Sequence, residues 1–291
     1  MPETLARIRR FNRAVTRETG AMEESFLGRG RPLGAARVLW AIGEAGRDVA
    51  DLRAELALDS GLLSRILRGL EAEGLAQLEP DPADRRRRRA TLTERGQAER
   101  AEYDRLNDQM AGAILARAPR HRDALLAAMD LVAVTLNADR IDIRPADPTD
   151  PSARACLAAY FALLSDKISG ISTAHVPDPD PDAPLFRPPH GTFLLAWCDR
   201  LPVGCVSLKP LEPGVAEVKR LWVDPAARGL GLARRLMRAV EDQARALGYG
   251  ALKLDTNAAL AEAITLYERS GWTPIAPYTG FPATHWFAKP L

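Results

Sequence analysis

Apolar residues in the first half of the chain recur at the three- and four-residue spacing of an amphipathic helix. This spacing predicts short helices over 33–44 and 49–56 and a third helix after Asp59, a residue type that caps helices well. The apolar stripe of the third helix leaves its opposite face polar, and a strand over 75–79 follows. The polar residues of interest on that helix are Ser60 at its start, then Ser64, Arg65 and Arg68.

In the second half, short runs of β-forming residues alternate with helical runs. Strands are predicted over 141–144, 192–197, 202–208, 216–223 and 251–256, and a helix over 152–168. We expect an α/β domain whose mixed sheet carries helices on both sides. Residues 176–191 are dense in Pro and Asp, which indicates a surface loop or the rim of a binding site.

Five consecutive arginines follow the strand predicted over 75–79, and a short β return comes after them. A basic turn between two strands, placed after a helix-turn-helix, makes a wing. The outer face of the third helix suits the DNA major groove, and an arginine-rich turn suits the more negative minor groove. Alternatively, the arginine run is a solvated hairpin tip.

The phrase Asp-Pro-x-Asp-x-Arg, which begins at Asp81, and the phrase Leu92-Thr93-x-x-Gly96 resemble the MarR family of winged-helix transcription regulators. The resemblance spans roughly residues 5 to 136. It implies a mainly helical domain that binds a double-stranded DNA operator and forms a homodimer through the long helices that start after Thr93 and after Pro119. The unbroken arginine stretch departs from the family pattern and leaves the register of the wing open. The predicted DNA-binding residues are Ser60, Ser64, Arg65, Arg68, Asp84, Arg85, Arg86, Arg87 and Arg88.

A second motif joins the strand 216–223 to a helix through a turn with two glycines. Gly229 and Gly231 can adopt positive φ and turn backbone N–H groups towards one point. The helix that begins near Gly231 adds its positive dipole end, and Arg228 adds a charge. The turn is therefore predicted to hold a pyrophosphate, although its spacing differs from the dinucleotide-binding pattern.

The spacing Arg-x-x-Gly-x-Ala in this turn resembles the acetyl-CoA loop of the GNAT superfamily of N-acetyltransferases. Later matches follow in order at 252–257, at Ala263 and at 266–272. The resemblance implies acetyl-CoA as co-substrate, no metal, and thioester and pantetheine binding by the backbone of Leu221, Trp222 and Val223. Asn257 is implied to contact the pantetheine arm. The residues implied for the pyrophosphate are Arg228, Gly229, Leu230, Gly231, Leu232, Ala233 and Arg234.

Two side chains are candidates for the chemistry. Tyr267 matches the tyrosine that donates a proton to the departing CoA sulfur, and the alternative is a packed aromatic ring. Glu217 shares a strand face with Lys219, and it is the candidate base that deprotonates the amine. The alternative for Glu217 is a surface ion pair.

Composition narrows the class of protein only a little. Among 291 residues, 40 Lys and Arg offset 38 Asp and Glu, so the net charge of +2 does not decide for or against nucleic acid. The three cysteines have no metal-ligand spacing, and no apolar run approaches the length of a membrane span. We expect a soluble cytoplasmic protein.

Together these patterns predict two domains, a MarR-like DNA-binding and dimerisation domain over 1–138 and a GNAT N-acetyltransferase domain over 139–291. The first hypothesis is a bifunctional regulator and enzyme that acetylates a primary amine of a small molecule or a lysine. In the second, a transcription factor uses a catalytically weak GNAT domain as a sensor of acetyl-CoA or a metabolite. In the third, the helical half serves an enzyme only for dimerisation. The sequence does not identify the acceptor amine.

Overall fold

The computed structural model describes residues 2–80, 84, 87–172 and 180–291. The chain folds into two compact units, Met1–Arg122 and Asp123–Leu291. Helix α6 (Arg122–Leu136) starts at this division and therefore belongs almost entirely to the second unit. The domain boundary at 138/139 stays a prediction.

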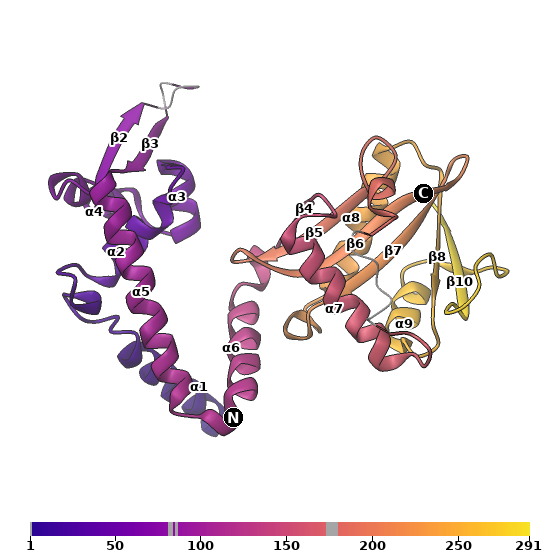
Figure 1. Cartoon of the computed structure of the whole chain (residues 1–291), viewed down its shortest axis with the longest axis horizontal. Helices are drawn as coiled ribbons and strands as arrows, with labels where there is room; N and C mark the ends of the chain where they lie inside the picture. The colour runs from indigo at the N-terminus through magenta and orange to yellow at the C-terminus, as the bar shows by residue number, and fades with distance from the viewer. Residues whose placement is uncertain (1, 81–83, 85–86, 173–179) are drawn as a thin grey trace. The chain divides into compact units, whose positions relative to one another are not determined.

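The first unit is mainly helical (Figure 1). A three-stranded sheet completes it, in the order β1-β3-β2. Its elements are α1 (Pro2–Glu18), η1 (Phe26–Gly28), α2 (Leu33–Ile42), β1 (Arg47–Asp48), α3 (Val49–Leu56), α4 (Ser60–Ala72), β2 (Ala76–Pro80), β3 (Arg88–Leu92), α5 (Glu94–Ala116) and η2 (Pro119–His121).

Side-chain caps fix the starts of three of these helices. Asp59 caps α4 by accepting the N–H of Leu62 at 2.8 Å, as predicted. Asp48 caps α3, and Thr93 caps α5 by accepting the N–H of Gly96 at 3.0 Å. A Cβ on Gly96 would lie 1.9 Å from the carbonyl oxygen of Leu75, so only glycine lets α5 pack this closely on the chain before β2. This contact gives a physical reason for the Leu-Thr-x-x-Gly phrase.

The wing is the antiparallel hairpin of β2 and β3 with the chain that joins them. Its register runs from Ala76 opposite Leu92 to Pro80 opposite Arg88. The hairpin is therefore confirmed. Sequence patterns did not predict β1, a two-residue strand that pairs with β3 and extends the sheet.

A cluster of two arginines and two glutamates connects the end of α4 to α5. Arg31 contacts Glu73 at the end of α4 at 2.6 Å and Glu99 on α5 at 2.8 Å. Arg29 forms a two-pronged ion pair with the same Glu99. Hydrogen bonding to Arg29 and then to Arg31 lowers the pKa of Glu99. Through Arg31 this cluster ties the end of α4 to α5.

The second unit is an α/β structure around a seven-stranded sheet, in the order β4-β5-β6-β7-β8-β10-β9 (Figure 1). Besides α6, its elements are η3 (Ala138–Arg140), β4 (Asp142–Pro145), α7 (Pro151–Lys167), η5 (Ala183–Phe186), β5 (Thr192–Cys198), β6 (Leu201–Glu212), β7 (Val215–Val223), η6 (Pro225–Ala227), α8 (Leu232–Ala246), β8 (Ala251–Thr256), α9 (Ala261–Arg269), β9 (Thr273–Pro274) and β10 (His285–Pro290).

Alternate residues of the strands face two different cores. Leu194 of β5 lies in the core that contains Leu236 of α8, whereas Leu195 lies in the core that contains Leu157 of α7. The sheet is mixed, as predicted, because β7 and β8 are parallel while its other pairs are antiparallel.

The parallel pair is short. Strands β7 and β8 pair only from Val215–Ala251 to Glu217–Lys253, although both strands continue for several fully described residues. The two strands therefore separate towards their carboxyl ends. A gap in a sheet at that edge is where ligands of α/β proteins commonly bind.

Candidate functional site

The turn after β7 has the conformation that its glycines suggested. Asp224 caps η6 by accepting the N–H of Ala226, and the chain then passes through Gly229 at φ 78° and Gly231 at φ 75°. Gly231 is the N-cap of α8 and supplies no side-chain partner for the first N–H groups of that helix. These groups and the helix dipole together favour an anion.

A bulge in β7 lies just before this turn. Lys219 faces Ser207 and Trp222 faces Cys205, so Arg220 and Leu221 both lie opposite Val206. Arg220 has a φ of 59°, unusual for a residue with a side chain. The bulge leaves ladder positions unpaired where β7 separates from β8. No pattern in the sequence indicated this bulge.

Two cavities lie along this gap. One, of about 260 Å³, is lined by residues that include Leu221, Asn257 and Tyr267. The other, of about 300 Å³, is lined by residues that include the predicted Leu221, Trp222, Val223, Arg228 and Ala233. The two adjoin, because they share Tyr160, Leu221, Leu260 and Ala263.

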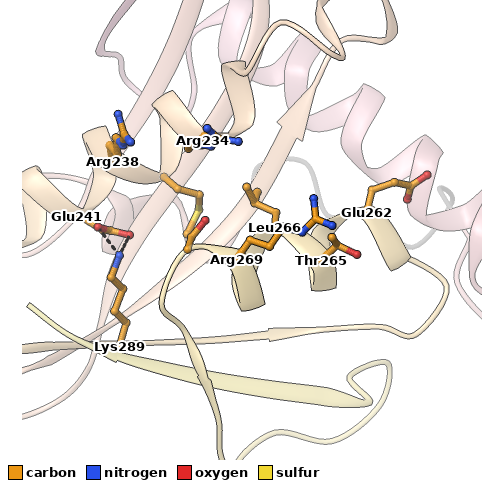
Figure 2. A pocket seen from close by; sticks show the side chains of 10 residues that line it. Arg234, Arg238, Glu241, Glu262, Thr265, Leu266, Arg269 and Lys289 are labelled. Carbon is orange, nitrogen blue, oxygen red and sulfur yellow. Dashed lines mark hydrogen bonds and ion pairs between the residues drawn. The ribbon is translucent and has the colours of Figure 1, made fainter.

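The remaining residues predicted for the pyrophosphate occupy different environments. Leu232 is buried in the core against the sheet, so only its backbone is available to a ligand, whereas Leu230 is half-buried and packs against that core. Arg228 is exposed, and its Nε lies 3.4 Å from the carbonyl oxygen of Val223. Arg234 lines a third cavity, which lies between α8 and α9 (Figure 2).

Tyr267 lines the first cavity and is 6% exposed. Its ring packs between Trp272 and Phe287, with centroids at 6.0 and 5.7 Å. Burial raises the pKa of its phenol, and nearby Tyr160 and Asp255 raise it further. The phenol is therefore protonated at neutral pH. It can act as an acid and as a packed aromatic at the same time.

Glu217 lies in a buried polar network. Its Oε1 accepts a hydrogen bond from the Tyr278 hydroxyl at 3.0 Å and lies 3.4 Å from Nζ of Lys219. Lys209 contributes a second positive charge, 3.8 Å from the other oxygen. Glu217 is ion-paired as the alternative interpretation expected, but it is 3% exposed and therefore not a surface residue.

A second carboxylate, Asp255, joins the same network and lines the cavity beside Tyr267. It contacts Lys219 at 2.8 Å and accepts a hydrogen bond from Thr279 at 2.8 Å. Sequence reasoning missed Asp255 as a functional residue, although it lies in the recognised segment 252–257. Tyr278 and Thr279 come from the loop before β10, which has no sequence pattern to reveal them.

Asn257 lines the cavity as well, but its amide group is already engaged. It donates to the carbonyl oxygen of Pro282 at 2.5 Å and accepts the N–H of Ala259 at 2.9 Å. These bonds hold the loop between β8 and α9 against the chain before β10. A ligand at this residue would compete for the remaining donor and acceptor capacity of the amide.

In the first unit, α4 presents the predicted polar face to solvent. Ser60, Ser64, Arg65 and Arg68 are all exposed, while Leu63, Leu67 and Leu70 of the same helix are buried. The side chain of Arg68 is directed back along the helix, with Nε 3.2 Å from the carbonyl oxygen of Ser64. Periodicity alone was sufficient to separate these two faces.

The wing arginines differ among themselves. Arg88 is exposed on β3, whereas Arg87 donates to the carboxylate of Asp48 at 2.9 Å. Asp84, which was also predicted to bind DNA, accepts the backbone N–H of Arg87 at 2.8 Å with its carbonyl oxygen. Arg85 and Arg86, both predicted to bind DNA, lie outside the described residues.

No group of three or more His, Cys, Asp or Glu side chains suited to a metal occurs among residues 2–80, 84, 87–172 and 180–291. In those same residues, no helix is both long and apolar enough to cross a membrane.

Comparison with known proteins gives the family. The model of the acetyltransferase (GNAT) family matches residues 158–272, and the MarR family model matches residues 29–87. An IAA acetyltransferase of Azospirillum brasilense is 39% identical over 114 residues, which cover 38% of this chain and 74% of the relative. The chain belongs to the GNAT acetyltransferase family. Its first unit carries a MarR-family segment, so the expected fusion is confirmed.

Other similar proteins match the GNAT part. The uncharacterised N-acetyltransferase YjgM of Escherichia coli is 32% identical over 122 residues, covering 41% of this chain and 71% of YjgM. A crystal structure of a putative acyl-CoA N-acyltransferase from Klebsiella pneumoniae is 28% identical and has a TM-score of 0.41. It covers 52% of this chain and 97% of that one. The prediction of an N-acetyltransferase is confirmed, and membership of the GNAT family supports acetyl-CoA as its co-substrate.

Proposed function

We propose that this chain is a DNA-binding transcriptional regulator and an acetyl-CoA-dependent N-acetyltransferase in one protein. The observation that carries the enzymatic part is the pair of adjoining cavities, one beside the start of α8 and the other beside Tyr267. A molecule with an anionic end and a long arm can span them. The acceptor is a primary amine of a small molecule or of a lysine.

In the proposed complex, the pyrophosphate binds the N–H groups of the turn from Gly229 and the first turn of α8, with Arg228 beside it. The pantetheine arm lies in the gap between β7 and β8. The backbone from Leu221 to Val223, next to the bulge, binds the thioester and stabilises the oxyanion that forms on its carbonyl oxygen.

The reaction breaks one bond and forms another. The neutral amine attacks the carbonyl carbon of the thioester, an N–C bond forms, and the C–S bond breaks. Tyr267 gives its proton to the departing sulfur, and the amine nitrogen loses a proton to a base. The products are the N-acetylated amine and CoA as a free thiol.

Glu217 remains the proposed base, but its burial restricts how it can receive the proton. Its bonds to Tyr278 and Lys219 leave it buried, so it must accept the proton through an intervening group or water. Asp255 is a second candidate because it lines the cavity directly. Glu217→Gln and Asp255→Asn distinguish them, since only loss of the true base moves the pH optimum upwards.

The regulatory part rests on α4 and the wing. The exposed Ser64, Arg65 and Arg68 suit the major groove of an operator, and Arg88 with the neighbouring arginines of the wing turn suits a minor groove. Asp84 shapes the wing turn through its backbone.

The homodimer is supported by α1. Four apolar side chains, at i, i+3, i+6 and i+10, share one side of this helix and remain between 41% and 53% exposed. An exposed stripe of this kind indicates a protein interface. The residues of the stripe are Leu5, Ile8, Phe11 and Val15. A dimer would place two copies of α4 on an operator with two half-sites, and such a regulator would act in the cytoplasm.

The sensor hypothesis differs in one respect only, since it requires acetyl-CoA binding without turnover. The presence of Tyr267 in the cavity favours turnover. The hypothesis that the first unit serves only for dimerisation leaves the exposed face of α4 without a role.

One pair of assays tests the proposal. Release of CoA is measured with a panel of amines, amino acids and lysine peptides, and binding to the DNA upstream of the protein's own gene is measured by gel shift at several salt concentrations. We expect turnover of at least one amine and DNA binding that weakens with salt. Tight acetyl-CoA binding without any turnover would replace the enzyme by the sensor. DNA binding that ignores salt would refute the regulator.

A further inference from the structure

The bulge of β7 puts Arg220 in a backbone conformation that residues with a side chain rarely adopt. Its φ of 59° lies in the left-handed region. The extra residue of a bulge has no place in the ladder of hydrogen bonds, so pairing with β6 does not fix it. Such a conformation persists only where other contacts hold it. The contacts of Arg220 therefore show what keeps the bulge in shape.

Four side chains around Arg220 supply these contacts. The thiol of Cys205 donates a hydrogen bond to its carbonyl oxygen at 3.3 Å. Its guanidinium carbon lies 4.4 Å from the ring centroid of Phe186 and 5.9 Å from that of Phe161. Its Nη1 donates to Oδ2 of Asp180, and only 10% of the side chain is exposed. Arg220 is therefore a mostly buried cation with a carboxylate partner.

Asp180 connects the bulge to the segment 180–187, which lies in the region rich in Pro and Asp. Its Oδ1 accepts the backbone N–H of Asp182 at 2.9 Å, and its carbonyl oxygen accepts that of Ala183 at 3.0 Å. These bonds fix its carboxylate just before η5 while the second oxygen binds Arg220. Asp180 therefore offers Arg220 a negative charge whose position is set by the fold.

The carbonyl of Arg220 and the N–H of Leu221 belong to one peptide group. A trans peptide is planar, and its C=O and N–H point in opposite directions. Because Cys205 of β6 holds the C=O, the N–H of Leu221 is directed away from β6 and towards the side of β7 on which β8 lies. There β8 has already separated, since the last paired residues are Glu217 and Lys253. This N–H therefore faces the gap between the two strands.

We propose that Asp180 is a positioning residue for acetyl transfer, which acts through Arg220 to keep the N–H of Leu221 directed at the thioester oxygen. The inference rests on the proposed function, in which the backbone from Leu221 to Val223 stabilises the oxyanion. A donor stabilises an oxyanion only if it already points at the position that the oxygen will occupy. Rotation of the peptide group after Arg220 would move this donor away, and the contact of Asp180 with Arg220 opposes that rotation.

The charge of Asp180 matters because Arg220 is mostly buried. A buried cation that loses its carboxylate is left without compensation, which is costly. The guanidinium would then turn into the cavity that it lines. The φ of Arg220 would lose one of the contacts that maintain it, and the N–H of Leu221 would no longer be fixed. Misplacement of a catalytic group by about 1 Å can slow an enzyme by about 10²-fold.

A simpler role for Asp180 would be to attach its own segment to the fold. The other end of the segment offers a matched control for that role. Arg187 forms a two-pronged ion pair with Asp147 at 2.8 Å, which attaches the segment to the chain before α7. Neither residue lines the cavity beside Tyr267. Asp147→Asn therefore loosens the segment and leaves Arg220 with its partner.

The test follows the carbonyl group of acetyl-CoA, so it does not depend on the acceptor. Acetyl-CoA labelled with ¹³C at the carbonyl is bound to the full chain, and its C=O stretching frequency is measured by isotope-edited infrared spectroscopy. A hydrogen bond to the oxygen lowers this frequency. We expect Asp180→Asn to raise it above the wild-type value and Asp147→Asn to match wild type. Asp180→Glu should recover most of the difference, because it keeps the charge.

Two further readouts separate positioning from binding. Calorimetry should give an almost unchanged Kd for acetyl-CoA in all three variants, since the proposed pyrophosphate site is intact. The kcat for any amine that wild type acetylates should fall at least about tenfold in Asp180→Asn and stay the same in Asp147→Asn. Thermal unfolding checks that each variant is folded. If Asp180→Asn does not fold, Asp180→Glu gives the same comparison on a smaller scale, because it displaces the carboxylate by one methylene.

Wild-type frequency and wild-type kcat in Asp180→Asn would overturn the inference while the proposed function stood. Equal changes in Asp180→Asn and Asp147→Asn would also overturn it, because attachment of the segment would then matter and not the contact with Arg220. Failure of wild type to bind acetyl-CoA would refute the proposed function itself.

Discussion

Arginines of the wing and arginines beside α8 illustrate two uses of the same side chain. Arg87 binds Asp48, and Arg89 donates to the carbonyl oxygen of Ala45 at 2.7 Å, so these wing residues hold their own domain together. Arg234 and Arg238 have no such partners within the described residues. A count of positive charges would rank the wing first as an anion site. The hydrogen bonds of Arg87 and Arg89 show that an arginine can bind an anion only if its guanidinium is not already engaged, however many arginines lie nearby.

Gly231→Asp places a carboxylate at the start of α8 and is expected to have the largest effect. The new carboxylate would face the site proposed for the pyrophosphate, so acetyl-CoA binding should be lost, by at least about a hundredfold. Calorimetry measures this. Gly214→Asp is the matched control, because Gly214 also has positive φ and open space at its Cβ but lies in the turn between β6 and β7. Unchanged affinity in the Gly231 variant would contradict the anion site.

Tyr267→Phe separates ligand binding from chemistry. The ring still packs against Trp272 and Phe287, so acetyl-CoA affinity should stay the same while kcat falls about 10²-fold. Tyr160→Phe is the control, because this second phenol lines the same cavity. If Tyr160→Phe lost the activity and Tyr267→Phe kept it, the acid would be Tyr160.

The pH profile gives a second check on Tyr267. Since burial raises its pKa above the ordinary value of 10.0, the phenol remains a proton donor throughout the neutral range. The wild-type rate should therefore show no descending limb from this group below pH 10. A limb near neutral pH that disappears in Tyr267→Phe would contradict the raised pKa.

Glu99→Gln removes the carboxylate with which both Arg29 and Arg31 form ion pairs. We expect the free energy of unfolding of the first unit to fall by about 3 kcal/mol, because Arg31 and Arg29 would lose their carboxylate. The folded-state pKa of Glu99 lies below its ordinary value of 4.5, so its contribution is complete above that pH and is lost as the pH falls through the lower folded value.

Denaturant unfolding at pH 7 and at pH 3 measures both parts of this prediction. Wild type should lose stability on acidification partly through Glu99, and the variant should lose less. Arg105 and Glu102, an exposed pair on the same helix, offer the control Glu102→Gln, which should have little effect. A Glu99 variant as stable as the control would show that the cluster contributes little.

Arg88→Ala and Arg87→Ala compare two neighbours with different partners, and the expected effect is the smallest. Loss of the exposed Arg88 should weaken operator binding by about tenfold and leave stability unchanged. Arg87→Ala should lower stability instead, because it leaves Asp48 at the start of α3 without its cation. Gel shifts and thermal unfolding measure the two effects. If both variants changed operator affinity and thermal stability in the same way, the partners of Arg87 and Arg88 would not determine their roles.

Local patterns predicted much of this molecule. The stripe of α4, its cap at Asp59 and the hairpin of the wing depend on neighbouring residues, and all were predicted. The bulge at Arg220 was missed because it depends on how β7 pairs with β6. The contact of Tyr278 with Glu217 joins segments far apart in the chain, so periodicity could not reveal it.

Sequence patterns were equally unable to predict which charged side chains have partners in the fold. Sequence alone placed Glu217 and Lys219 on one strand face, but it could not show that Glu217 is buried beneath Tyr278 while Asp255 lines the cavity. Nor could it distinguish Arg87 from Arg88. Which charged groups are satisfied is decided by three-dimensional neighbours, and these neighbours separate a structural residue from a candidate functional one.

The cluster around Arg31 has a mechanical consequence. One guanidinium joins the end of α4 to α5, a helix of 23 residues and therefore about 35 Å long. The two helices are therefore linked through the ion pairs of Arg31 with Glu73 and Glu99. If α4 enters the major groove as proposed, a small rotation of α5 would change the tilt of α4 on the operator through this link.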